Sequence, residues 1–125
     1  MGAICLTAGL IATTLPLQAL TLAWTHSIEK IRWEEDYRVV DRRLILTEAR
    51  IKGSGAGMEP PDAALLRNGV WHYRPALPPL ERLRLTHSPY AKDYELCNAG
   101  SCRSLAELLP GMADTAVVEV APCDR

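Results

Sequence analysis

The chain has 125 residues, of which 48% are hydrophobic, and this is enough for one domain with a substantial core. Fourteen basic and fifteen acidic side chains leave a formal net charge of −1. That balance lacks the basic face on which nucleic-acid binding depends, so no nucleic-acid partner is expected.

The first nineteen residues form an apolar segment without a formal charge. The segment ends in Leu15-Pro16-Leu17-Gln18-Ala19, and a helix-breaking proline before a small residue is typical of a signal-peptide cleavage region. We therefore expect residues 1–19 to be a signal peptide and residues 20–125 to be a single β-rich domain. The alternative is an uncleaved membrane anchor, because about 20 apolar residues span a bilayer.

Alternation of apolar and polar residues dominates the rest of the chain and indicates β-strands. Turn residues separate the alternating runs, which predict strands over residues 20–29, 35–40, 43–52, 70–74, 83–88, 94–97 and 115–121. One short helix is expected at Leu105–Leu109, with Ser104 as N-cap and Glu107 completing a capping box. The pattern predicts a mainly β protein, a small antiparallel β-sandwich or barrel of about seven strands with one short helix.

Four cysteines suggest an oxidising compartment. Cys5 would leave with a signal peptide, so Cys97, Cys102 and Cys123 would remain. A turn sequence separates Cys97 from Cys102, which favours a disulfide across a hairpin and leaves Cys123 as a free thiol. Cys123 is the competing partner for either of them. Their spacing is not that of a zinc site, and no metal or cofactor is expected.

The densest group of polar residues lies near the end of the first predicted strand. His26, Ser27, Glu29 and Lys30 could together bind an anionic group. Ser27 is not a nucleophile served by His26, because neighbours on a strand point to opposite faces. A core role for the His26 ring is the alternative, and no catalytic residue is predicted.

A glycine-rich loop follows the third predicted strand. Gly53, Ser54, Gly55 and Gly57 could form a backbone nest for a carboxylate, or simply a tight turn that needs positive φ. The prolines that follow, at 60 and 61, exclude the helix that a phosphate-binding loop requires.

Several of these motifs together resemble one bacterial family. They are the stretches 24–30 and 33–35, the loop 53–58 and the hairpin that carries Cys97 and Cys102. The chain is similar, from about residue 20 to residue 123, to the domain of unknown function 1850 family. The resemblance implies a small exported or membrane-associated protein, often encoded beside tripartite periplasmic transporters with a TAXI-type solute-binding protein. It implies no catalytic residues.

From these observations we expect a non-enzymatic accessory or binding module of periplasmic solute transport. Its partner would be a transporter subunit, the solute-binding protein or a small anionic ligand. A first alternative is a protein-interaction domain that docks through Trp33, Trp71 and Tyr73. A second alternative is a hydrolase that uses His26 with a distant carboxylate.

Overall fold

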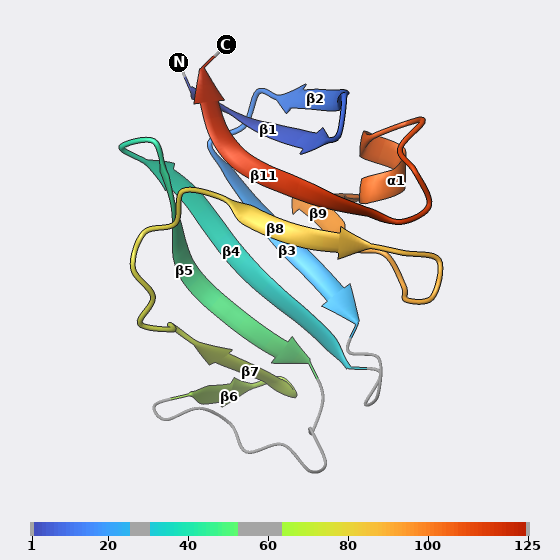
Figure 1. Ribbon diagram of the computed structural model, residues 1–125. Coiled ribbons are helices and arrows are strands. Elements are labelled where there is room, and N and C mark those ends of the chain that lie inside the picture. Colours follow the sequence, from blue (N-terminus) through green and yellow to red (C-terminus); the bar gives the residue numbers. More distant parts are fainter. Residues whose placement is uncertain (1, 26–30, 53–63, 125) are drawn as a thin grey trace.

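A computed structural model describes residues 2–25, 31–52 and 64–124 of the protein (Figure 1). The strands are β1 (Gly2–Ala8), β2 (Ile11–Leu15), β3 (Ala19–Thr25), β4 (Arg32–Val40), β5 (Arg43–Lys52), β6 (Leu65–Arg67), β7 (Val70–Tyr73), β8 (Leu83–His87), β9 (Glu95–Asn98), β10 (Ser101–Ser104) and β11 (Ala116–Asp124). The helix is α1 (Leu105–Leu108).

Two antiparallel sheets of unequal size form a sandwich. Sheet A has the strand order β2-β1-β11-β8, and sheet B has the order β10-β9-β3-β4-β5-β7-β6. The prediction of a mainly β sandwich with one short helix is confirmed, with eleven strands in the described residues rather than about seven. Sheet A lies over one end of sheet B, and the lower ends of β3, β4 and β5 extend beyond it in Figure 1.

The N-terminal segment is part of sheet A. β1 pairs with β11 and with β2, and Ile4 and Leu6 of β1 are fully buried. Cys5 forms a disulfide with Cys123, so the expectation of a free thiol at Cys123 is wrong. The segment therefore has a folded role in this structure, and cleavage before Leu20 stays a prediction. The described residues contain no helix long and apolar enough to cross a membrane.

Most of the predicted elements occur where alternation placed them. β5 has the predicted bounds, whereas β3 is described only as far as Thr25. The Cys97–Cys102 disulfide joins β9 to β10, as expected. The capping box of α1 is also confirmed: Ser104 Oγ accepts from Glu107 N at 3.1 Å, and Glu107 Oε1 accepts from Ser104 N at 3.1 Å.

The core lies between sheet A and the covered end of sheet B. Sheet A contributes Ile4, Leu6, Val118 and Val120, all fully buried. Sheet B contributes a row of directly paired residues in which Leu20 faces Tyr37 and Tyr37 faces Leu46. Burial of these side chains removes apolar surface from water and so holds the two sheets together.

Candidate ligand-binding site

A second row of residues crosses the inner face of sheet B further from sheet A. Trp24 is paired with Trp33, Trp33 with Ile51, and Ile51 with Trp71. Directly paired residues point to the same face of a sheet, and Trp24 packs against the core, so the whole row faces inward. Three tryptophans, on β3, β4 and β7, thus lie on the inner face at this end of sheet B.

The aromatic rings of this row are ordered by contact. Trp24 stacks on Trp33 with ring centroids 6.1 Å apart and planes inclined by 21°. On its other side, Tyr94 approaches Trp24 with centroids 6.1 Å apart and a tilt of 52°. Both geometries are favourable for aromatic pairs, so the three rings form one apolar wall.

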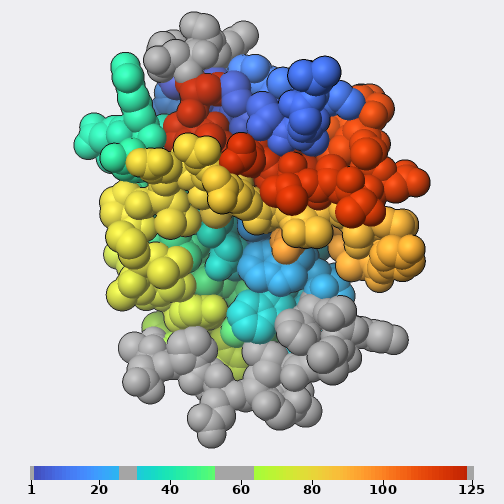
Figure 2. Space-filling model, in the orientation of Figure 1, coloured from blue at the N-terminus to red at the C-terminus, as the bar shows by residue number. Residues whose placement is uncertain are grey.

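A cavity of about 330 Å³ adjoins this wall. Its lining residues are Trp24, Thr25, Thr86, Ser88, Ala91, Lys92, Asp93 and Tyr94. The volume lies at the lower end of the range of small-molecule sites, which combine apolar walls with a few polar groups. Figure 2 shows this side of the molecule, with atoms of β3 and β4 visible below β8 and the segment that follows it.

The segment between β8 and β9 is held in place by Asp93. Asp93 Oδ1 lies 2.9 Å from His87 Nδ1 and accepts from Tyr94 N at 2.9 Å, while Oδ2 accepts from Ala106 N at 3.0 Å. These bonds tie the segment to β8 and to the start of α1. They fix the backbone from which Lys92, an exposed cation, reaches the cavity.

The pair formed by His87 and Asp93 is therefore a structural tie. A catalytic base of this kind would need a nucleophile on its other ring nitrogen. Ser88 follows His87 directly, and its Oγ accepts from Tyr90 N at 3.4 Å within the same turn. The described contacts of these residues are thus those of a turn that forms part of the cavity wall.

Glu35 places a carboxyl group on the inner face of sheet B, in the row between Leu22 and Ala49. Both neighbours are buried, and the Glu35 carboxylate accepts a hydrogen bond of 2.8 Å from Tyr37 Oη. Burial raises the pKa of Glu35 despite this bond, and burial also raises the pKa of Tyr37 and of Tyr73. The carboxyl therefore holds its proton at a higher pH than a surface glutamate does.

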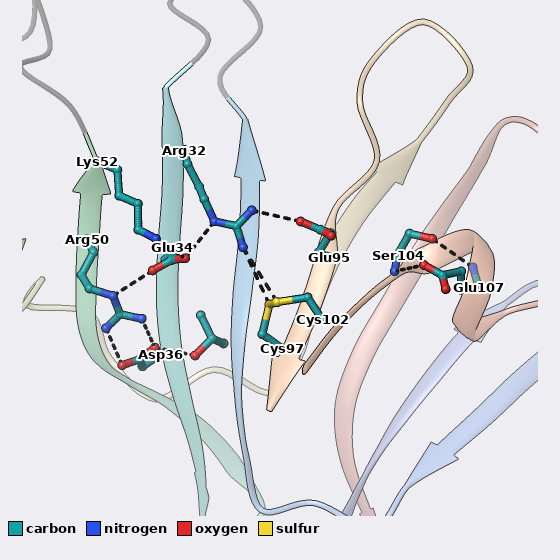
Figure 3. The surroundings of a disulfide bond; sticks show 11 residues. Arg32, Glu34, Asp36, Arg50, Lys52, Glu95, Cys97, Cys102, Ser104 and Glu107 are labelled. Carbon is teal, nitrogen blue, oxygen red and sulfur yellow. Dashed lines mark hydrogen bonds and ion pairs between the residues drawn. A yellow bond between two sulfur atoms is a disulfide. The ribbon is translucent and has the colours of Figure 1, made fainter. Parts of the chain in front are cut away.

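The outer face of sheet B carries a network of ion pairs centred on Arg50 (Figure 3). Arg50 binds Asp36 through both terminal nitrogens, at 2.6 and 2.7 Å, and binds Glu34 through Nε at 3.0 Å. Its Nη1 also donates to Glu48 at 2.9 Å, and Glu48 lies 2.9 Å from His72 Nδ1. The network continues through Glu34 to Arg32, at 2.8 Å.

These contacts decide how the carboxylates titrate. The hydrogen bonds from Arg50 lower the pKa of Asp36, and the contact with His72 lowers that of Glu48. Burial alone would raise the pKa of Glu34, but the bonds from Arg32 and Arg50 outweigh it and lower the pKa. A guanidinium fills the space among the carboxylates, and the described part of the chain contains no group of three residues able to hold a metal ion. The network is best explained as a structural brace across β4, β5 and β7.

The polar residues singled out in the sequence lie outside the described residues. They are His26, Ser27, Glu29 and Lys30, together with Gly53, Ser54, Gly55 and Gly57. The strands β3 and β4 on either side of the first segment are paired at Thr25 and Arg32. The strand before the second segment, β5, is paired with β4 at Ile51 and Trp33. The anion-binding role of these residues stays a prediction.

The aromatic residues proposed for docking lie on the inner face of sheet B. Trp33, Trp71 and Tyr73 are half-buried there, because Trp33 and Trp71 both flank Ile51 and Tyr73 is paired with Ala49. Tyr90, by contrast, is 94% exposed. The three residues therefore lie on the inner face of sheet B, and their role in docking stays a prediction.

The cavity was missed by sequence reasoning because its residues come from β3, β8 and the segment before β9. No local motif links Trp24 with Tyr94 or with Lys92. The available signal was the alternation that places Trp24 and Leu22 on the core face of β3, together with a lysine between predicted strands. Nothing in the spacing predicts that the two regions meet.

Comparison with known proteins identifies the chain at the level of a family. A model of the family described as a domain of unknown function (DUF1850) matches residues 20–105, more than half of the chain. The chain belongs to this family. No curated protein and no solved structure matches it significantly.

The part that matches the DUF1850 model contains the cavity. All of its lining residues lie between positions 24 and 94. Nearly all of sheet B lies in the matched range as well, whereas β1, β2 and β11 of sheet A lie outside it. The candidate site thus belongs to the family domain, and the strands outside the match cover one end of it.

Proposed function

We propose that this DUF1850 domain is an exported binding module for a small organic anion. The single observation that carries the proposal is the cavity beside Trp24 and Tyr94, with Lys92 at its wall. Aromatic walls favour a flat apolar body, and a lysine ammonium favours a carboxylate. Thr25, Thr86 and Ser88 add hydroxyl groups that can hydrogen-bond the polar end of a ligand.

Export is supported by the disulfides. Cys5–Cys123 and Cys97–Cys102 pair all four cysteines, and such bonds persist in oxidising compartments. We extend the proposal to an accessory role in periplasmic solute uptake. That extension rests on the gene neighbourhood that the family resemblance implies, and the transporter subunit and its solute-binding protein are the proposed partners.

A titration with benzoate tests the binding function, with the neutral amide benzamide as comparison. Benzoate matches the aromatic wall and the lysine, so it should quench tryptophan fluorescence, and benzamide should bind roughly tenfold more weakly because one charge-assisted hydrogen bond is lost. Failure of benzoate to bind at millimolar concentration would contradict the proposal and would favour the protein-interaction alternative.

The three lysines of the chain provide the matched variants, at positions 30, 52 and 92. Lys92→Gln should weaken benzoate binding roughly tenfold, since it removes the cation at the cavity. Lys52→Gln is the control, because Lys52 lies 3.4 Å from Glu34 on the outer face of sheet B. Lys30→Gln tests the role predicted for the segment after Thr25. If Lys52→Gln weakens binding as much as Lys92→Gln, the cavity is not the site.

A further inference from the structure

The disulfide between Cys97 and Cys102 lies on the outer face of the hairpin at one edge of sheet B. Cys102 is exposed, whereas Cys97 is half-buried beside β3. A thiolate attacks a disulfide along the line of the two sulfur atoms and needs open access to one of them. The exposed position of Cys102 gives that access, and it directs attack to Cys102 Sγ.

Arg32 provides a cation at this bond. Its Nη2 lies 3.8 Å from Cys97 Sγ and 3.9 Å from Cys102 Sγ, as Figure 3 shows. Nε and Nη1 are held by Glu34 at 2.8 Å and by Glu95 at 3.0 Å, so the third nitrogen is directed to the sulfurs. A neighbouring guanidinium stabilises a thiolate and makes it a better leaving group.

The hairpin does not depend on the disulfide for its shape. Ala99 and Gly100 have φ values of 52° and 81°, and positive φ at both central residues is the geometry of a two-residue hairpin turn. Four residue pairs join β9 to β10, and β9 also pairs with β3. The bond closes a sequence separation of 5, against 118 for Cys5–Cys123, so it contributes much less chain entropy to stability.

We propose that Cys97–Cys102 is a site of thiol–disulfide exchange with a dithiol protein. One thiolate of the dithiol attacks Cys102 Sγ, the bond between the two sulfurs breaks, and its electron pair goes to Cys97 Sγ beside Arg32. The second thiolate of the dithiol protein then attacks the first sulfur of the same protein, which is bonded to Cys102 Sγ in the mixed disulfide. That bond breaks, and Cys102 takes a proton from solvent. Two electrons pass to the domain, and the dithiol becomes a disulfide. The site lies on the face of sheet B opposite the cavity, so it is independent of the proposed ligand.

Equilibration of the full chain in dithiothreitol redox buffers tests this assignment, with alkylation and mass spectrometry of the cysteine peptides. Cys5–Cys123 is the internal reference. We expect Cys97–Cys102 to be reduced at a ratio of reduced to oxidised dithiothreitol at least roughly tenfold lower than the ratio that reduces Cys5–Cys123. The far-ultraviolet circular dichroism spectrum should stay unchanged. Reduction of both bonds together, or only with loss of the spectrum, would overturn the proposal.

Variants of Arg32 test the role of the cation. Arg32→Gln should require a roughly tenfold more reducing buffer for Cys97–Cys102 and leave Cys5–Cys123 unchanged, because the thiolate loses its counter-charge. Arg32→Lys keeps the charge and should stay close to the wild type. Arg103→Gln is the control, since Arg103 neighbours Cys102 on β10 but faces the other side with Leu96. The role of Arg32 would be contradicted if Arg32→Gln and Arg103→Gln changed the buffer needed to reduce Cys97–Cys102 equally, or if neither changed it.

Discussion

Glu35 and Asp36 are neighbours on β4 whose side chains lie on opposite faces of sheet B. Glu35 shares the inner face with buried Leu22 and Ala49, whereas Asp36 forms a two-nitrogen ion pair with Arg50 on the outer face. Burial raises the pKa of Glu35, and the bonds from Arg50 lower the pKa of Asp36. Position on the strand, and not residue type, decides which carboxyl keeps its proton.

Replacing Glu35 tests the inner carboxyl. The pKa of Glu35 is higher in the folded chain than in the unfolded chain. Glu35 therefore lowers stability as the pH rises from its unfolded pKa through its folded pKa. Glu35→Gln should therefore increase the free energy of unfolding at neutral pH, by about 1 kcal/mol, and have little effect near pH 4. Denaturant unfolding at several pH values measures this, with Glu81→Gln, a surface change, as control. A loss of stability at neutral pH would contradict the account of Glu35.

Replacing Asp36 should have the opposite dependence on pH. The folded pKa of Asp36 is below its unfolded value, so its stabilisation is present above the unfolded pKa and is lost as the pH falls. Asp36→Asn should cost about 1 kcal/mol at pH 7, a value reduced for the partial exposure of the pair, and much less at pH 3. Equal costs at both pH values would show that the ion pair with Arg50 contributes little.

At the scale of elements, local patterns predicted the strands well where one face is buried and the other is polar. β5 has the predicted bounds, and its buried residues alternate as Leu44 and Leu46 and then, after a one-residue shift at an irregularity in the pairing with β4, as Ala49 and Ile51. The N-terminal hairpin was not predicted, because β1 and β2 carry no charged residue and resemble the apolar part of a signal peptide. Cys5 and Thr7, which alternate with Ile4 and Leu6, were the signal for a strand. The pairing of Cys5 with Cys123 spans nearly the whole chain, and no local pattern carries that information.

The capping box of α1 is the clearest local prediction and can be tested alone. Ser104→Ala removes the side-chain acceptor for Glu107 N and should cost about 1 kcal/mol of unfolding free energy. Ser104→Asp keeps an acceptor and should cost less. Thermal or denaturant unfolding compares the two, and an equal cost for both variants would count against the cap.

The N-terminal hairpin provides a second test at this scale. A chain that starts at Leu20 lacks β1 and β2 and exposes the edge of β11 that pairs with β1, including buried Val120. We expect that chain to lose cooperative unfolding, because it also loses a disulfide of the kind worth about 4 kcal/mol. Mass spectrometry of the exported protein shows which form exists. A stable, cooperative chain that begins at Leu20 would support the signal-peptide prediction and contradict a folding role for the hairpin.

At the scale of the whole molecule, the unequal sizes of the two sheets create the candidate site. Sheet A packs on the row formed by Leu20, Tyr37 and Leu46, and the lower ends of β3, β4 and β5 extend beyond it (Figure 1). The cavity lies where Thr86 of β8 meets Trp24 of β3. A sequence pattern shows that Trp24 faces inward. It does not show where the opposing sheet ends, so the fold class was predictable and the cavity was not.

The binding site itself is tested most directly by mapping benzoate on the folded domain with ¹H–¹⁵N nuclear magnetic resonance. The account predicts saturable shifts of the Trp24 indole signal and of the amides of Thr86, Ser88, Lys92 and Tyr94. In Lys92→Gln the same shifts should require a roughly tenfold higher benzoate concentration. Shifts confined to residues 26–30 and 53–57 would place the site on the predicted polar patch instead. No shifts at millimolar benzoate, or shifts only at the sheet edges β6 and β10, would contradict the cavity as the functional site.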